Sequence, residues 1–183
     1  DERVHEARLT LPQVCRLWYA GSVTRWLLSL TLAVAAACGG SGASDQAVVA
    51  GPEAMTTPYL TIQETLARDS IDGLSQLSAR VVTAAEPVQA ALGVPEIIAG
   101  AGRVAVPDID TARLAFSKMS MGLISYLKQH PGERGDLEVV FCPMAFNNKG
   151  AYWVQRKGEI INPYHGMMML HCGDKVAWDQ APG

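Results

Sequence analysis

Sulfur and imidazole side chains gather near the end of the chain, in two short stretches. The first stretch reads FCPMAFNNKGAYW and the second reads NPYHGMMMLHCG. Thiolates and thioethers are soft donors that select soft ions, so a shared site would favour copper(I), with silver(I) as a chemical mimic and zinc as the second choice of metal. The candidate metal ligands are Cys142, Met144, Met169 and Cys172, with His165 as an auxiliary ligand.

Local signals predict the elements that position the first group of donors. Apolar residues alternate with others from Leu137 to Phe141, which indicates a short strand ending in a Cys-Pro-Met turn. Pro143 restricts Cys142 to an extended backbone. The following segment, 151–161, predicts a small hairpin around Lys157-Gly158.

The second group of donors is predicted to lie on a short helix. Asn162-Pro163 is typical of a helix start, and Gly173 is typical of a helix end. His165, Met169 and Cys172 are then four and three residues apart, so they would share one helix face.

The N-terminal segment resembles a bacterial lipoprotein signal. Arg25 supplies a positive charge, and residues 26–37 form a short apolar run that ends in small residues. The run ends in Ala-Ala-Ala-Cys, which resembles a lipidation site at Cys38, and a Gly/Ser-rich tether follows it. These features predict a periplasmic or cell-surface protein with a lipid anchor, the outer membrane being favoured. The alternatives are a transmembrane anchor or a buried helix.

This location leaves two cysteines in the predicted domain, in a compartment that favours oxidation. A Cys142–Cys172 disulfide would close a loop of about 30 residues and would stabilise the fold by roughly 3–4 kcal/mol. The methionines would then be packing residues, and spacing alone favours this interpretation over a metal site. A redox-active pair is a third option, although no C-x-x-C motif supports it.

Three apolar stripes predict helices in the middle of the chain. The first follows a cap at Thr57-Pro58, the second follows Asp69-Ser70 and ends near Pro87, and the third begins near Asp110 and stops before Pro131. Residues 92–110 contain several Gly and Pro residues and predict mainly loop, with a short helical turn at 95–99. Met119 and Met121 fall in the third predicted helix, where methionine usually fills the core, so both are assigned to the core rather than to a metal site. The predicted fold class is mainly α, an antiparallel helical bundle with a small irregular or β-containing C-terminal segment.

The predicted organisation and composition narrow the function classes. Residues 1–22 are predicted to be a non-native upstream extension, 23–37 the signal peptide, 38–55 the tether, 56–177 the helical metal-associated domain and 178–183 a tail. The net charge of −3, without a basic block, and the 7% aromatic content argue against a nucleic-acid partner. An enzyme is not predicted, because no acid–base pair or activated nucleophile stands out.

The two C-terminal stretches resemble the signature of a bacterial extracytoplasmic domain of unassigned function. That domain occurs alone in lipoproteins and at the C-terminus of CusB-like adaptor subunits of copper and silver efflux systems. The resemblance covers about 57–174 and implies a heavy-metal-associated module with an efflux or metallochaperone protein as partner. The matching positions are Cys142, Pro143, Met144, Gly150, Trp153, Gln155, Asn162, Pro163, Tyr164, Gly166, Met169, Leu170, Cys172 and Gly173.

These observations predict a lipid-anchored, non-catalytic protein that binds copper(I) as a chaperone, buffer or efflux accessory. In that interpretation Tyr164 and Trp153 are walls of the site rather than ligands. The alternative is an interaction lipoprotein stapled by a Cys142–Cys172 disulfide, whose partner docks on the aromatic C-terminal segment.

Overall fold

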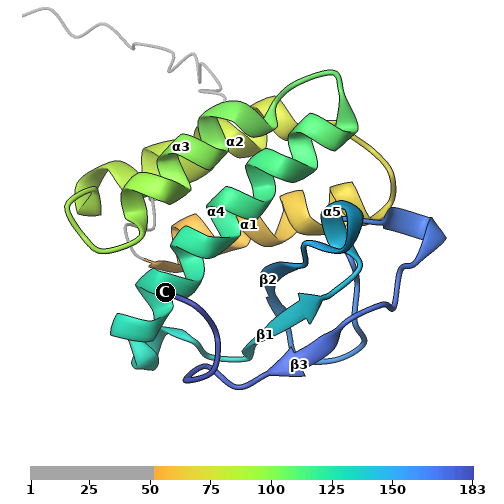
Figure 1. Ribbon diagram of the computed structural model, residues 1–183. Coiled ribbons are helices and arrows are strands. Elements are labelled where there is room, and N and C mark those ends of the chain that lie inside the picture. The colour runs from red at the N-terminus through yellow and green to blue at the C-terminus, as the bar shows by residue number, and fades with distance from the viewer. Residues whose placement is uncertain (1–51) are drawn as a thin grey trace, which may run out of the picture. The chain divides into compact units, whose positions relative to one another are not determined.

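The computed structural model describes residues 52–183, which form helices followed by a small sheet (Figure 1). The helices are α1 (Pro52–Ala67), α2 (Leu74–Ala85), α3 (Val94–Val104), α4 (Ile109–Gln129) and the short α5 (Ala145–Asn148). The strands are β1 (Leu137–Cys142), β2 (Ala151–Arg156) and β3 (Asp174–Val176), and 3-10 turns lie at Glu86–Val88, Pro131–Glu133 and Gly166–Met168. The predicted signal peptide and the predicted lipidation site, Cys38, lie outside the described residues.

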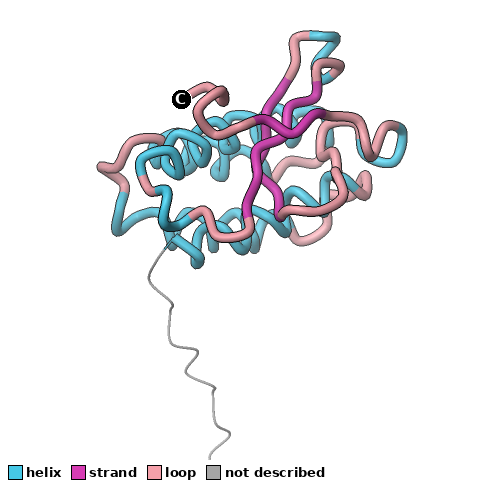
Figure 2. Tube along the Cα trace, turned by 90° about the horizontal axis from the view of Figure 1, so that it is seen from below, coloured by secondary structure: helices cyan, strands magenta, loops and turns pink. Residues whose placement is uncertain are grey.

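The fold is mainly α with a small C-terminal β segment, as the sequence predicts. The sheet is antiparallel in the order β2-β1-β3. It packs against α4 and α1 through β2, and the view from below shows the strands crossing under the helices (Figure 2). The strand predicted to end at the Cys-Pro-Met turn is confirmed by β1. None of the described helices is long and apolar enough to cross a bilayer.

Two predicted helix starts are wrong. The first helix begins at Pro52, inside the segment predicted as tether, and Pro58 lies within it rather than at its first turn. The second helix begins at Leu74 after Gly73, whose left-handed φ of 73° no β-branched residue would accept easily. Asp69 and Ser70 therefore do not cap it, and Asp69 instead takes part in the site described below.

The loop predicted for residues 92–110 is largely a helix, α3. Gly93 precedes the helix with a φ of 85°, and Pro95 lies in the first turn, where its missing N–H costs no hydrogen bond. The buried residues Ile97, Ala101 and Val104 lie on one face at spacings of four and three. Glycine and proline thus occur here within a helix and at its start rather than in a loop.

The C-terminal helix predicted for residues 162–172 and the hairpin predicted at Lys157-Gly158 are both wrong. The first segment contains only the 3-10 turn Gly166–Met168, because Gly166 has a φ of 54° and turns the chain against the Asp69 carboxylate. In the second case β2 pairs with the preceding strand, β1, rather than with residues 159–161.

The C-terminal tail packs on the helical layer. Lys128 Nζ donates to the Ala181 carbonyl at 2.6 Å, and Ala181 is buried. The Arg134 guanidinium lies 4.6 Å above the ring centre of Trp178. The C-terminus consequently lies beside α4 (Figure 1).

Helices α3 and α4 approach closely because glycines lie between them. A Cβ on Gly100 would lie 2.6 Å from the backbone nitrogen of Met119 and 2.8 Å from the carbonyl oxygen of Ala115. Met119 is fully buried, as predicted, whereas Met121 is only half-buried. By contrast, a Cβ on the exposed Gly102 would meet no atom within 4 Å.

Substituting these two glycines of α3 should change stability in opposite directions. Gly100→Ala should lower the free energy of unfolding by about 1–3 kcal/mol, because the added methyl group forces the helices apart. Gly102→Ala, the matched control, should raise it by about 0.5–1 kcal/mol, because alanine restricts the unfolded chain. Urea unfolding measures both, and equal effects would contradict the close helix contact.

Candidate functional site

The two predicted cysteine ligands lie together at one end of the sheet. Cys142 is the last residue of β1 and is fully buried, while Cys172 precedes β3 by two residues and is half-buried. Because Phe141 is paired with Asp174 across β1 and β3, Cys172 lies just beyond the paired part, diagonally opposite Cys142. The two Sγ atoms are 3.5 Å apart, and both residues are free thiols.

A separation of 3.5 Å is compatible with two kinds of chemistry. Disulfide sulfurs are about 2.05 Å apart, so closing a bond needs a small approach. Two thiolates on one tetrahedral ion with metal–sulfur bonds of about 2.3 Å are about 3.8 Å apart. The thiols are therefore already close to the spacing that a shared metal ion requires.

Asn162 organises the segment that carries Cys172. Its fully buried side chain donates from Nδ2 to the Cys172 carbonyl at 2.7 Å and accepts from the Tyr164 N–H at 2.8 Å. Its backbone N–H donates to the Leu170 carbonyl at 2.7 Å. One buried amide thus joins both ends of the loop, and it fixes the backbone of Cys172.

Arg113 of α4 attaches the same loop to the helices. Its buried guanidinium donates to the carbonyl oxygens of Pro163 (2.9 Å) and Leu66 (3.1 Å), and it lies 2.6 Å from the Asp69 carboxylate. Asp69 also accepts the Met167 N–H at 2.9 Å. These two hydrogen-bond partners, first the Met167 amide and then Arg113, lower the pKa of Asp69. One charged cluster, formed by Arg113 and Asp69, therefore holds the loop at Pro163 and Met167 against α1 and α4.

Aromatic rings form the inner wall of this region. The Tyr164 ring is edge-on to Trp153 at 5.7 Å and tilted against Phe146 at 5.2 Å between ring centres. The Tyr164 hydroxyl donates to the Tyr152 carbonyl at 2.6 Å, and burial raises the pKa of Tyr164. Both Trp153 and Tyr164 are buried, and their role as walls of a metal site stays a prediction.

The turn after Cys142 has an unusual backbone. Phe146, Asn147 and Asn148 have φ values of 52°, 59° and 65°, a left-handed run in which a residue such as Phe146 is rare. Such conformations cost about 1–3 kcal/mol each and tend to occur at functional sites. The run reverses the chain so that Gly150 N–H bonds the Ala145 carbonyl at 3.0 Å.

The other three predicted ligands have different outcomes. Met169 begins a turn that ends at Cys172, since the Cys172 N–H donates to the Met169 carbonyl at 3.0 Å. The Met144 side chain is 45% exposed. His165 is half-buried, and its Nε2 is a buried atom without a hydrogen-bond partner among the described residues. No helix brings His165, Met169 and Cys172 onto one face, so the geometric reason given for His165 is wrong.

Thiol protonation is set by the same surroundings. The pKa of Cys172 is raised, first by desolvation and then by the Cys142 thiol and the negative charge of Asp174. At neutral pH this thiol therefore remains protonated until a metal ion or a reagent replaces the proton. Within residues 52–183, no group of three or more His, Cys, Asp or Glu side chains is placed to hold a metal ion, so thioethers would have to complete a coordination shell.

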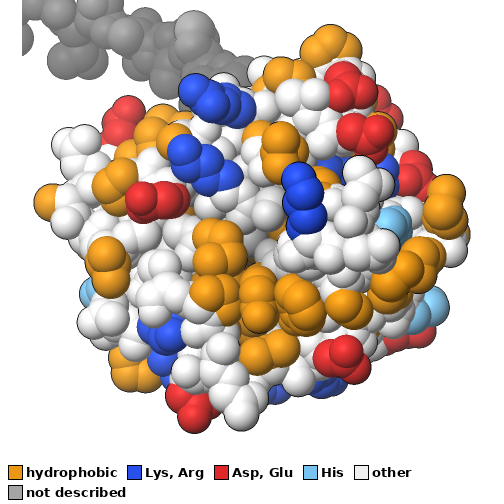
Figure 3. Space-filling model, viewed as in Figure 1, with side chains coloured by type: hydrophobic (Ala, Val, Ile, Leu, Met, Phe, Trp, Pro, Cys, Tyr) orange, Lys and Arg blue, Asp and Glu red, His pale blue; other side chains and the backbone are white. Residues whose placement is uncertain are grey.

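Hydrophobic side chains also reach the surface, and they form a band on the face shown in Figure 3. The exposed large hydrophobic residues of the described part include Met144, Met167 and Met168, the last two 64% and 85% exposed. These methionines lie in or beside the segments that carry the two cysteines.

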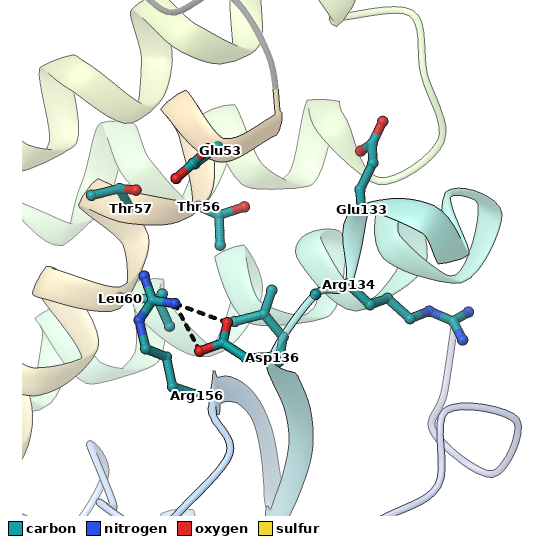
Figure 4. A pocket seen from close by; sticks show the side chains of 10 residues that line it. Glu53, Thr56, Thr57, Leu60, Glu133, Arg134, Asp136 and Arg156 are labelled. Carbon is teal, nitrogen blue, oxygen red and sulfur yellow. Dashed lines mark hydrogen bonds and ion pairs between the residues drawn. The ribbon is translucent and has the colours of Figure 1, made fainter.

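A separate cavity of about 440 Å³ lies at the opposite end of the sheet (Figure 4). It borders the Leu137–Arg156 pair of the ladder, whereas Cys142 pairs with Ala151 at the other end. Arg156 forms an ion pair with Asp136 at 2.8 Å on one wall. The remaining lining residues are Glu53, Thr56, Thr57, Leu60, Glu133, Arg134 and Gly135.

No protein-family model, curated protein or solved structure matches this chain. The resemblance of the two C-terminal stretches to an extracytoplasmic domain therefore stays a prediction.

Sequence reasoning missed the residues that position the site. Arg113 lies among the buried residues of α4 without any motif around it, and Asp69 was predicted to cap a helix. A single arginine among buried positions of a helix is a usable signal, because a buried guanidinium needs several acceptors from other segments.

The depressed pKa of Asp69 predicts a specific pH dependence. Its stabilising effect is complete above the ordinary aspartate pKa of about 3.9 and is lost as pH falls through the lower folded-state value. Asp69→Asn should therefore unfold more easily at pH 7, by about 1 kcal/mol, and match the parent protein at strongly acidic pH. Asparagine tolerates the φ of 56° at this position, so the comparison isolates the charge.

Denaturant unfolding across pH measures this difference, with Asp72→Asn at an exposed neighbouring position as the control. A constant difference between parent and Asp69→Asn at every pH would contradict the ionic role of Asp69.

Proposed function

We propose that this protein is a non-catalytic, soft-metal-binding module that holds copper(I) between Cys142 and Cys172. The observation that carries the proposal is the 3.5 Å separation of two free thiols, which lie on segments fixed by the sheet and by the Asn162 hydrogen bonds. Thiolates select soft ions, so copper(I) is the proposed ion, with silver(I) or zinc as further possible ions. Binding would replace the two thiol protons.

The proposed shell is completed by side chains close in sequence to the thiols. Met169 lies in the same turn as Cys172, and Met144 follows Cys142 by two residues. His165, the auxiliary ligand predicted from the sequence, is left out of the proposed shell, because within the described residues it forms no metal-holding group with the two cysteines. The donor set therefore fits a soft ion better than a hard one.

The proposed biological setting follows the sequence predictions. The chain is proposed to be a lipoprotein attached through Cys38 at the periplasmic or cell-surface side, where it serves as chaperone, buffer or efflux accessory. Its partner would be an efflux or metallochaperone protein, as the resemblance to the extracytoplasmic domain implies. In this proposal the helices act as an antiparallel bundle, a rigid support for the two loops.

A second candidate function rests on the same distance. If Cys142 and Cys172 form a permanent disulfide, the segment is a stapled interaction surface and the methionines are contact residues. The two candidates differ after reduction, because only the metal-binding protein then has two thiols in the domain that take up copper(I).

Competition titration of the reduced protein with copper(I) and a chromophoric chelator tests the ligand set. Cys142→Ser and Cys172→Ser should each weaken binding by more than about 100-fold, because each removes a thiolate. Met144→Leu and Met169→Leu should each weaken it by about 10-fold, since leucine keeps the volume but lacks the sulfur.

Met168→Leu is the matched control, since Met168 is a neighbouring, highly exposed methionine. Its affinity should equal that of the parent protein. If the two serine variants bind copper(I) as tightly as the parent, the thiols are not ligands and the metal proposal fails.

A further inference from the structure

The two thiols are adjacent but differ in access. Cys142 has no exposed surface, because it ends β1 within the hydrophobic core. Cys172 is half-buried and lies in the loop before β3. A dissolved reagent can therefore reach Cys172 but not Cys142, whose Sγ lies 3.5 Å from the Sγ of Cys172.

The surroundings allow the sulfurs to approach without moving the sheet. Cys142 is fixed in the β1–β2 ladder opposite Ala151. The backbone of Cys172 is fixed by Asn162 and by its N–H bond to Met169, whereas its side chain is only half-buried. A rotation of the Cys172 side chain is thus the motion that can bring the sulfurs to the bonding distance of about 2.05 Å.

We propose that this pair is a redox switch, in which a small-molecule disulfide converts the metal-binding dithiol into a closed Cys142–Cys172 disulfide. The inference rests on the proposed function and adds its regulation. Cys172 first gives up its proton and then, as the thiolate, attacks one sulfur of the reagent, which forms a mixed disulfide and releases the first thiol carrying that proton. The Cys142 thiolate then attacks Cys172 Sγ and releases the second thiol. The protein loses two electrons and two protons, and the reagent disulfide gains both.

Closure removes both thiolates from the ion, because a disulfide sulfur has no negative charge to offer a metal. Oxidation therefore turns binding off, and reduction restores it. The linkage is reciprocal, so an ion bound to the dithiol must protect it from oxidation by the same free energy. Neither effect needs a change in the helices.

The test treats the full chain with oxidised glutathione and identifies its products by mass spectrometry of proteolytic peptides. This assignment keeps Cys15 and Cys38 separate from the domain thiols. The parent protein should yield a Cys142–Cys172 crosslink. Cys142→Ser should stop at a glutathione adduct on Cys172, and Cys172→Ser should leave the buried Cys142 unmodified. Circular dichroism confirms that each variant is folded.

Copper(I) competition on the crosslinked and the re-reduced parent protein completes the test. Crosslinking should weaken copper(I) binding by more than about 100-fold, and reduction should restore it. An adduct on Cys142 in Cys172→Ser, the absence of a crosslink, or equal copper(I) affinity in both forms would overturn the switch. Weak binding by the reduced protein would instead overturn the proposed metal function, and the glutathione products would still report on the order of thiol attack.

Discussion

The arrangement of this domain depends on one buried guanidinium. Arg113 of α4 donates to the carbonyl oxygens of Leu66, at the end of α1, and of Pro163, in the loop that leads to Cys172. It also donates to the Asp69 carboxylate, and so connects α1, α4 and this loop. A buried charge of this kind is tolerated only when every donor finds an acceptor. The loop that carries Cys172 therefore has one favourable position against the helices. Asn162 then fixes the cysteine within this loop, because its side-chain amide donates to the Cys172 carbonyl.

The consequence for the site is an ordered pair of unlike thiols. Cys142 belongs to the sheet and the core, whereas Cys172 belongs to the loop held by Arg113 and Asn162. Burial and neighbouring groups raise the pKa of the Cys172 thiol and so keep it protonated. The pair thus combines a fully buried thiol with a half-buried one, and this difference in access underlies the proposed copper(I) site and its redox switch.

Several elements were predictable from local sequence, because local contacts decide them. Helix α4 follows its apolar stripe, and β1 follows its alternation and ends at Cys142 as expected. The convergence of Cys142 and Cys172 was also expected. Helix α3 was missed because Gly100 reads as a loop signal, although it serves helix packing. The loop before β3 was mistaken for a helix because the contact between Gly166 and Asp69 joins residues far apart in the chain, and no local pattern reveals it.

X-ray absorption at the copper edge of the reduced, copper(I)-loaded protein shows whether both thiols bind one soft ion, as proposed. We expect a first shell dominated by sulfur, with fewer sulfur neighbours in Cys142→Ser and in Cys172→Ser. A first shell of nitrogen and oxygen alone, identical in the parent protein and in both variants, would contradict it.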